Sequence, residues 1–342
     1  MKRLLSLCLL AILLIGCKSR KQDNYENRNI KVDFMLPTTP IKDQGASSSC
    51  WIYGMLATIE TEHLVQGDSV NLSADYVIRM YLREQAMQRL YGKHKFGNKD
   101  IGTRGMMPMT IDLINTYGLQ HEDAFHRDEH TNYNVIARKL SQLTNGISDF
   151  TLKDIDDYLD KSIAFSPKQV FMYGAIYTPQ EFAHSVCSDN EYTPITSFMH
   201  HPFNERFPLE VPDNKYHSTY LNLPLDKMMR LIEESLHHHH PVCWEGDVSE
   251  KGFNWQEGIA DIDASDLPIT PEKRQKAFEH HTTTDDHVMA IIGMGHDAKG
   301  KKYFLCKNSW GKSNRYGGFI FLSYDYVKYK TCLLYTSDAA DE

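Results

Sequence analysis

The chain has 342 residues, a formal net charge of −8 and an apolar fraction of 41%. That length corresponds to about two domains at roughly 150 residues each. The apolar fraction is that of a globular protein with a core and excludes a disordered chain. An acidic protein lacks the surplus of lysine and arginine that neutralises phosphates, so we expect no nucleic-acid partner.

The N-terminus begins with Lys2-Arg3 and continues with an almost purely apolar run over residues 4–15. This run is shorter than the ~20 residues that a membrane-spanning helix needs, and its design is that of a secretory signal. It ends in Leu14-Ile15-Gly16-Cys17, which resembles a bacterial lipobox. The resemblance implies a lipoprotein signal peptide over residues 1–16 and a lipid on the Cys17 thiol. An ordinary signal peptide with an incidental cysteine is the alternative.

Residues 17–33 follow as a mostly polar stretch, which we predict to be a lipidated, flexible tether. The chain would then lie in the bacterial cell envelope, on the periplasmic or surface side, anchored to a membrane without spanning it. The seven cysteines are widely scattered and include no CxxC pair. This spacing predicts neither a zinc ribbon nor a thioredoxin-like site.

Apolar residues at helical spacing dominate the first half of the chain. Ser49 and Ser73 each stand directly before such a segment, where a hydroxyl can cap the first turn. Residues 92–108 contain four glycines and a proline and are predicted to be a loop. The predicted helical segments are 51–66, 74–87, 109–118, 134–161 and, later in the chain, 225–240.

Short apolar or alternating runs bounded by glycine and proline dominate the second half, and these are typical of strands. Because helices come early and strands come late, the predicted fold class is α+β with the two kinds of element segregated. The predicted strands are 170–178, 241–248, 287–295, 302–310 and 318–324.

Cys50 stands where the first predicted helix begins. A thiol reacts as a thiolate, and the partial positive charge of a helix N-terminus lowers the pKa of a nearby thiol. Gln44 lies six residues upstream in a loop, from which its amide can donate to an oxyanion together with the Cys50 backbone N–H. We therefore predict that Cys50 is a nucleophile; a buried, inert cysteine is the alternative.

His287 begins a predicted strand, and Asn308 follows the strand-like run Tyr-Phe-Leu-Cys-Lys at 303–307. An asparagine can accept the imidazole N–H and thereby fix the tautomer and the ring plane, as suits a thiolate–imidazolium pair. We expect Trp310 to cover that hydrogen bond. These positions predict a Cys50–His287–Asn308 triad.

Residues 41–51, the Asn-Ser-Trp-Gly motif at 308–311 and the Gly-Gly-Phe-Ile motif at 317–320 resemble the papain-like cysteine peptidases. Ser47 and Ser48 stand where relatives have a cysteine and a glycine. The resemblance implies a peptidase domain over residues 34–330. A helical left half would lie mainly at 45–165, a β-barrel-like right half mainly at 170–330, and the active site between them.

His287 follows Cys50 by 237 residues, against ~130–150 in compact papain types. This insertion, with residues 117–119, 178–182, 220–224 and 241–248, resembles the bleomycin hydrolase/aminopeptidase C branch. The branch implies a peptide or protein substrate, leaves aminopeptidase and endopeptidase action open, and leaves an oligomer open because relatives are often hexameric. We expect Gly105, Trp51 and Trp310 to contact the substrate, although Arg104 precedes Gly105 where many relatives have another glycine.

No metal or cofactor is predicted. Four consecutive histidines at 237–240 point in different directions on a helix, so they cannot converge on one ion. Residues 331–342 match no strand or helix of the family, and we expect a tail that is not native. Two functions compete with a cysteine peptidase: an inactive papain-fold binding lipoprotein, and an amidase acting on cell-wall peptides with a Cys–His pair.

Overall fold

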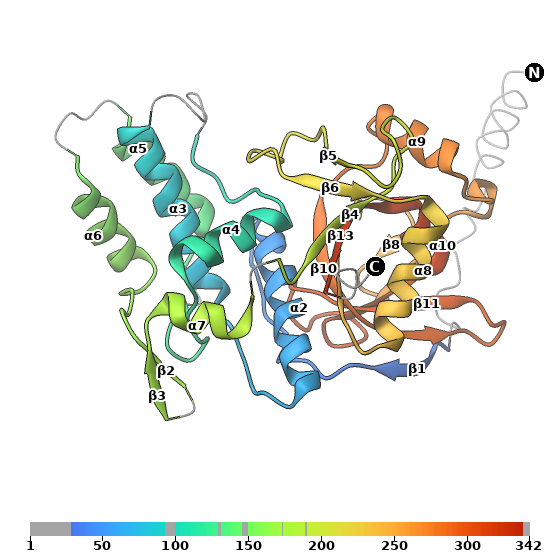
Figure 1. Cartoon of the computed structure of the whole chain (residues 1–342), viewed down its shortest axis with the longest axis horizontal. Coiled ribbons are helices and arrows are strands. Elements are labelled where there is room, and N and C mark those ends of the chain that lie inside the picture. Colours follow the sequence, from blue (N-terminus) through green and yellow to red (C-terminus); the bar gives the residue numbers. More distant parts are fainter. Residues whose placement is uncertain are drawn as a thin grey trace, which may run out of the picture.

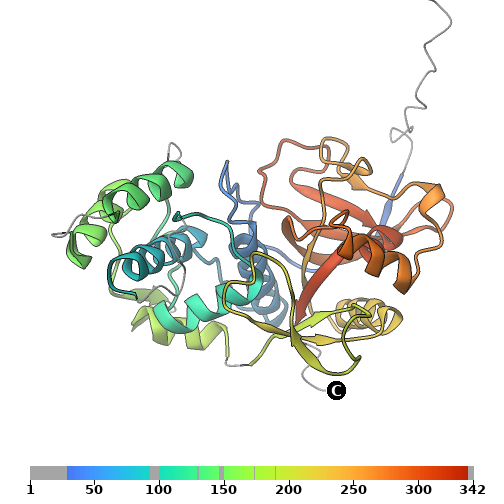
Figure 2. The same cartoon turned by 90° about the horizontal axis from the view of Figure 1, so that it is seen from above.

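In the computed structural model, a group of helices lies beside a large sheet, and helix α2 (Cys50–Gln66) runs between them (Figure 1). The view from above shows the same division (Figure 2). The predicted signal peptide and the predicted lipidation site Cys17 lie outside the residues that the structure describes. Those residues are 29–92, 100–128, 131–145, 150–172, 174–188 and 190–337.

The helices begin at capping residues that the sequence supplies. The Ser73 hydroxyl accepts the Tyr76 N–H at the start of α3 (Ala74–Tyr91), and Thr178 forms a reciprocal capping box with Glu181. The other helices are α4 (Met107–Tyr117), α5 (Tyr133–Leu143), α6 (Leu152–Ser162), α7 (Pro179–Val186), α8 (Leu225–His237), the 3-10 helix η3 (Ala264–Asp266), α9 (Pro271–Glu279) and α10 (Tyr324–Lys330).

The large sheet is built around β10 (His287–His296), which pairs with β7 (Val242–Gly246), β11 (Lys302–Lys307) and β1 (Lys31–Met35). The strand order is β5-β6-β4-β13-β7-β10-β11-β12-β9-β8, with β1 added against β10. A separate hairpin joins β2 and β3. The remaining bounds are β2 (Val170–Met172), β3 (Ala175–Tyr177), β4 (Thr193–Thr196), β5 (Arg206–Pro208), β6 (Thr219–Asn222), β8 (Phe253–Asn254), β9 (Ile259–Ala260), β12 (Phe319–Ser323) and β13 (Thr331–Thr336).

This arrangement confirms the predicted α+β class with helices early and strands late. Within the described residues the sheet is an open path from β5 to β8 and not a closed barrel. The predicted helical stretch 134–161 is two helices, α5 and α6, rather than one. Two hydrophobic clusters fill the interior, one mainly among the helices and one mainly against the sheet.

The C-terminal segment differs from its prediction. Residues 331–342 were expected to be a tail without secondary structure, but Thr331–Thr336 form β13 in the middle of the sheet, between β4 and β7. All six residues are buried. A strand that is buried on both faces carries no alternation of polar and apolar residues, and for that reason the expected strand pattern was missing.

Gly54 lets α2 lie directly against β10. A Cβ atom at this position would stand 2.5 Å from the Val288 Cγ1 atom, which is closer than atoms can approach. Any larger residue would push the helix away from the strand. The fold therefore brings the start of α2, at Cys50, close to the start of β10, at His287.

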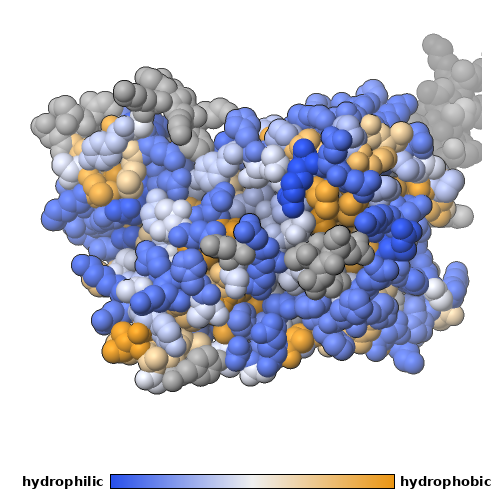
Figure 3. All heavy atoms as spheres, in the orientation of Figure 1, coloured by the Kyte–Doolittle hydropathy of each residue, from blue (hydrophilic) through white to orange (hydrophobic). Residues whose placement is uncertain are grey.

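The outer surface is largely hydrophilic on the face shown in Figure 3, where apolar residues form small separate patches. Among the described residues, none of the helices combines the length and the apolar character that crossing a bilayer requires.

Candidate active site

Cys50 is the first residue of α2 and is 9% exposed. The preceding Ser49 makes no side-chain hydrogen bond to the first turn, and the Trp51 backbone N–H of that turn hydrogen-bonds the Cys50 sulfur. The backbone N–H of Val288, the residue after His287, hydrogen-bonds the Cys50 sulfur. Cys50 and His287 line the same pocket, so residues that are far apart in the sequence meet there.

His287 and Asn308 are each 3% exposed, and the Nε2 atom of His287 lies 2.7 Å from the Oδ1 atom of Asn308. The Ser309 backbone N–H donates to the same Oδ1 atom over 2.8 Å. Because an N–H can only donate, this bond identifies Oδ1 as the acceptor. His287 must then donate from Nε2, and a neutral imidazole keeps Nδ1 free to take a proton.

Gln44 is tied to the Asn308 loop through Ser309. Its backbone N–H donates to the Ser309 carbonyl over 2.8 Å, and its Oε1 accepts the Ser309 hydroxyl over 2.7 Å. Its Nε2 donates one proton to the Ser47 carbonyl over 2.7 Å. Gln44 lines the pocket beside Cys50, and the second Nε2 proton is a donor available to a bound oxygen.

The three residues expected to contact substrate occupy different positions. Trp310 lines the pocket, with its ring 4.5 Å from that of His287. Gly105 also lines the pocket, and a Cβ atom there would stand 2.7 Å from the Trp51 ring. The Trp51 side chain is fully buried and donates to the Thr103 carbonyl over 2.9 Å. Trp51 therefore lies behind Gly105 and supports the pocket wall from inside.

Electrostatics in this pocket favour the neutral forms of Cys50 and His287. Burial, followed by the nearby charges of Glu245 and Asp286, raises the pKa of Cys50 to about 12. Burial lowers the pKa of His287 to about 4, against the opposing hydrogen bond to Asn308. A helix terminus alone would lower the pKa of the Cys50 thiol, but desolvation is the larger effect here. A thiolate at Cys50 would form only if the thiol proton passed to a base such as the neutral His287 imidazole.

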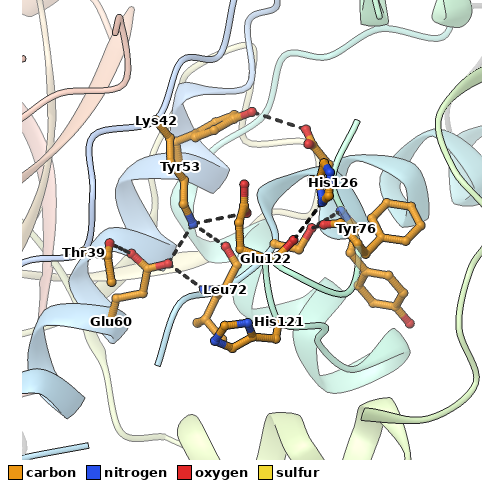
Figure 4. A network of polar contacts seen from close by, with 12 residues as sticks. Thr39, Lys42, Tyr53, Glu60, Leu72, Tyr76, His121, Glu122 and His126 are labelled. Carbon is orange, nitrogen blue, oxygen red and sulfur yellow. Dashed lines mark hydrogen bonds and ion pairs between the residues drawn. The ribbon is translucent and has the colours of Figure 1, made fainter. Parts of the chain in front are cut away.

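Glu60 lies in a buried network of polar contacts with Thr39, Lys42 and Leu72 (Figure 4). It is 1% exposed, and Lys42 Nζ lies 2.8 Å from its Oε1 atom. Lys307 Nζ lies 3.6 Å from its Oε2 atom. Although burial opposes it, the two lysines hold the pKa of Glu60 below its usual value. Since Glu60 belongs to the helix of Cys50 and Lys307 directly precedes Asn308, this network ties that helix to the strand that ends before Asn308.

Sequence reasoning missed both Glu60 and a set of acidic residues in the pocket. A glutamate among the apolar positions of a predicted helix was a usable signal for Glu60. The pocket is also lined by four acids and one arginine, and two of the acids directly precede His287 in the sequence. These residues are Arg104, Asp213, Glu245, Asp285 and Asp286.

One group of side chains has the spacing of metal ligands: His200, His201 and Glu210. Buried Gln275 donates from Nε2 to the Nδ1 atom of His200 over 3.0 Å, while its Oε1 accepts the Met199 N–H. The His200 proton therefore sits on Nε2, where it is donated to Glu210 over 3.0 Å. These hydrogen bonds occupy the nitrogen that would have to bind a metal, so the group is satisfied without one.

The family model described as the Peptidase C1-like family matches residues 130–332. The match includes His287 and Asn308 and begins after Cys50. No curated protein matches the sequence. The crystal structure of PepW from Lactobacillus rhamnosis HN001 superposes with a TM-score of 0.67 at 18% identity, covering 90% of this chain and 82% of that chain.

Two further solved structures superpose less closely. The clostridial cysteine protease Cwp84 gives a TM-score of 0.44 at 16% identity, covering 87% of this chain and 54% of that chain. The bromelain protease from Ananas comosus gives 0.42 at 15% identity, covering 87% and 93%. At such identities only the PepW superposition is informative, and it shows a shared fold.

Proposed function

This chain belongs to the Peptidase C1-like family, and on that premise we propose that it is a cysteine peptidase in which Cys50, His287 and Asn308 form the triad. The observation that carries the proposal is the pair of hydrogen bonds on Asn308 Oδ1, from His287 and from the Ser309 N–H. They leave His287 Nδ1 as the base in a pocket that also contains Cys50. An asparagine that merely filled space would not need this arrangement.

The proposed reaction begins when His287 Nδ1 takes the thiol proton and the Cys50 sulfur attacks the peptide carbonyl carbon. The oxyanion accepts hydrogen bonds from the free Nε2 proton of Gln44 and from the Cys50 backbone N–H. His287 then gives its proton to the leaving amine as the C–N bond breaks, which leaves a thioester on Cys50. Water, deprotonated by His287, hydrolyses the thioester and restores the thiol.

The test is hydrolysis of fluorogenic peptides by the wild type and by Cys50→Ala. We expect kcat/KM to fall by at least about 10³-fold in the variant, since covalent catalysis is lost. Cys187→Ala is the matched control, because Cys187 is also a buried cysteine but does not line the pocket. Activity that survives Cys50→Ala would contradict the proposal. Equal inactivity of wild type and variant would favour the inactive binding lipoprotein, and turnover of peptidoglycan peptides alone would favour the amidase.

We also propose that the chain is lipid-anchored in the bacterial cell envelope through Cys17, on the strength of the Leu14-Ile15-Gly16-Cys17 segment. The test is fractionation of expressing cells with mass spectrometry of the mature N-terminus. A diacylglyceryl group on Cys17 is the expected result. A soluble product that is cleaved elsewhere, from both the wild type and Cys17→Ser, would contradict it.

A further inference from the structure

The acidic residues of the pocket are not equally satisfied. Asp213 binds the one arginine of the pocket, Arg104, with its Oδ2 atom 2.8 Å from Nε and 2.7 Å from Nη2. Asp286 Oδ1 accepts the Val248 N–H over 2.8 Å. Glu245 Oε2 and Asp285 Oδ2 are buried, and neither has a hydrogen-bond partner within the described part of the chain. Two residues that line the pocket therefore each keep a carboxyl oxygen whose hydrogen-bonding capacity the described part of the chain does not use.

Glu245 is held in a fixed position beside the catalytic residues. It is 1% exposed and belongs to β7, where it pairs in register with Val288, the residue after His287. The backbone N–H of Met107, at the start of α4, hydrogen-bonds its carboxyl group. One side of the carboxyl is thus fixed by the protein, and Oε2 is the unpartnered oxygen of a residue that lines the pocket.

A buried carboxyl group without a partner is destabilised in its charged form. Burial accordingly raises the pKa of Glu245 well above its usual value and raises the pKa of Asp285 to about 6. A positively charged donor in the pocket would supply the missing hydrogen bonds and reverse this effect, because charge-assisted bonds are stronger than neutral ones. A ligand with an ammonium or guanidinium group therefore fits this wall better than an apolar one.

A metal ion fits less well. Among the described residues, the group of three or more His, Cys, Asp or Glu ligand atoms at metal spacing is His200, His201 and Glu210, and it includes none of the pocket acids.

We propose that the pocket selects substrates carrying a positively charged group next to the bond cleaved at Cys50, with Glu245 and Asp285 as the residues that recognise it. The inference rests on the proposed peptidase function and names its substrate class. The charge belongs either to a lysine or arginine side chain or to a free α-amino group. Both present the same N–H donors to Glu245 Oε2 and Asp285 Oδ2, and the experiment below separates them.

The experiment compares kcat/KM for coumarylamide dipeptides in which lysine, norleucine or glutamate occupies either position, each with a free and an acetylated N-terminus. We expect lysine to exceed its neutral isostere norleucine by about tenfold or more at one position, with glutamate the poorest. A preference for the free amine over the acetylated form, whatever the side chain, would identify the α-amino group as the bound cation. Equal rates for all charges, blocked and free, would overturn the inference while leaving the peptidase function intact.

Glu245→Gln separates recognition from a structural role. Glutamine can still accept the Met107 N–H but carries no charge, so we expect the ratio of kcat/KM between lysine and norleucine substrates to shrink to about threefold or less. Glu257→Gln is the control, since Glu257 pairs with Arg315 at 3.3 Å and does not line the pocket. A preference that survives Glu245→Gln would overturn the assignment.

Equilibrium binding of the same peptides to full-length Cys50→Ala, with and without Glu245→Gln, tests recognition without turnover. Lysine peptides should bind about tenfold more tightly than norleucine peptides only when Glu245 is present. Equal binding of the two peptides would overturn the inference, whether or not the wild type hydrolyses peptides. An absence of cysteine-dependent hydrolysis would count against the proposed function instead.

Discussion

Two sets of residues at the pocket differ in their hydrogen bonding, and we call them the bonded wall and the acidic wall. In the bonded wall, His287 is hydrogen-bonded to Asn308, and Ser309 joins Asn308 to Gln44, over distances of 2.7–2.8 Å. In the acidic wall, Glu245 and Asp285 each keep a buried oxygen that has no hydrogen-bond partner among the described residues. Groups that must hold one geometry through a reaction need such fixed bonds. Groups that recognise a substrate need an atom whose hydrogen-bonding capacity is unused. Such an atom in a buried site lowers the stability of the free protein until a ligand bonds to it.

Within the described part of the chain, one side-chain atom of the bonded wall is buried without a hydrogen-bond partner, the Nδ2 atom of Asn308. This does not loosen Asn308, because Oδ1 already accepts two hydrogen bonds. The contrast between the walls therefore makes separate predictions: damage to the first should disturb structure or kcat, and damage to the second should affect selectivity and even raise stability.

Glu60→Gln should have the largest effect, on stability. It leaves Lys307 buried without its carboxylate and leaves Lys42 with Glu122 at 3.4 Å, and breaking a buried ion pair costs about 3–5 kcal/mol. Denaturant unfolding at neutral pH measures the loss. Asp226→Asn is the control, since its pair with Lys328 has a carboxylate that is 74% exposed and is expected to contribute less than about 1 kcal/mol. A loss no larger than that of Asp226→Asn would show that the network does not hold the bonded wall.

Asn308→Ala should have the second-largest effect, which is a fall in kcat. Without Oδ1 the imidazole loses its fixed tautomer and orientation, so kcat should fall about 100-fold while KM changes little. Asn308→Asp keeps an acceptor and should retain more activity at its own optimal pH. Steady-state kinetics across pH measures both variants. An unchanged kcat in Asn308→Ala would mean that His287 is held by its surroundings alone.

Asp285→Asn should have the smallest effect of the three variants, and it should raise the free energy of unfolding rather than lower it. Burial raises the pKa of Asp285 to about 6 in the folded chain, against about 4 in an unfolded one. Between these values the folded protein binds a proton that the unfolded chain has lost, so this group lowers the free energy of unfolding as pH rises through the window. Asp285→Asn has no carboxyl group at this position, so its free energy of unfolding does not fall for this reason.

Urea unfolding of the wild type and Asp285→Asn from pH 4 to pH 7.5 checks this sign. The stability of the variant relative to the wild type should increase from pH 4 to pH 6 and then level off. The neighbours that share the pocket, Arg104, Asp213, Asp286 and Glu245, are present in both proteins and cancel in the difference. A difference that is constant with pH would mean that Asp285 is as well hydrated as a surface acid.

The α+β class was predictable because local signals are strong at both ends of the chain. Ser73 stands directly before an apolar helical pattern, and β-branched and aromatic runs form β10 and β12. Both kinds of signal depend only on neighbouring residues. The strand β13 was not predictable, because its six buried residues show no alternation and its pairing with β4 and β7 is decided by distant sequence.

The grouping of Cys50, His287, Asn308 and Gln44 was predictable because their residue types imply complementary chemistry, and their catalytic roles stay a prediction. Glu60 and Glu245 were missed because their significance depends on their surroundings. Both are buried; Glu60 lies between two lysines, and Glu245 has an oxygen without a partner among the described residues. A lowered pKa was also predicted for Cys50, but burial raises that pKa. The helix N-terminus can be recognised in the sequence, whereas the depth of burial cannot.

The most direct measurement is the site of labelling by a peptide chloromethyl ketone, mapped by mass spectrometry after digestion. The described residues contain five free cysteines, all buried: Cys50, Cys187, Cys243, Cys306 and Cys332. We predict a single adduct on Cys50 that depends on His287 and is absent in His287→Ala. An adduct on another cysteine that abolishes peptide hydrolysis, or full activity after Cys50 has been alkylated, would contradict the account.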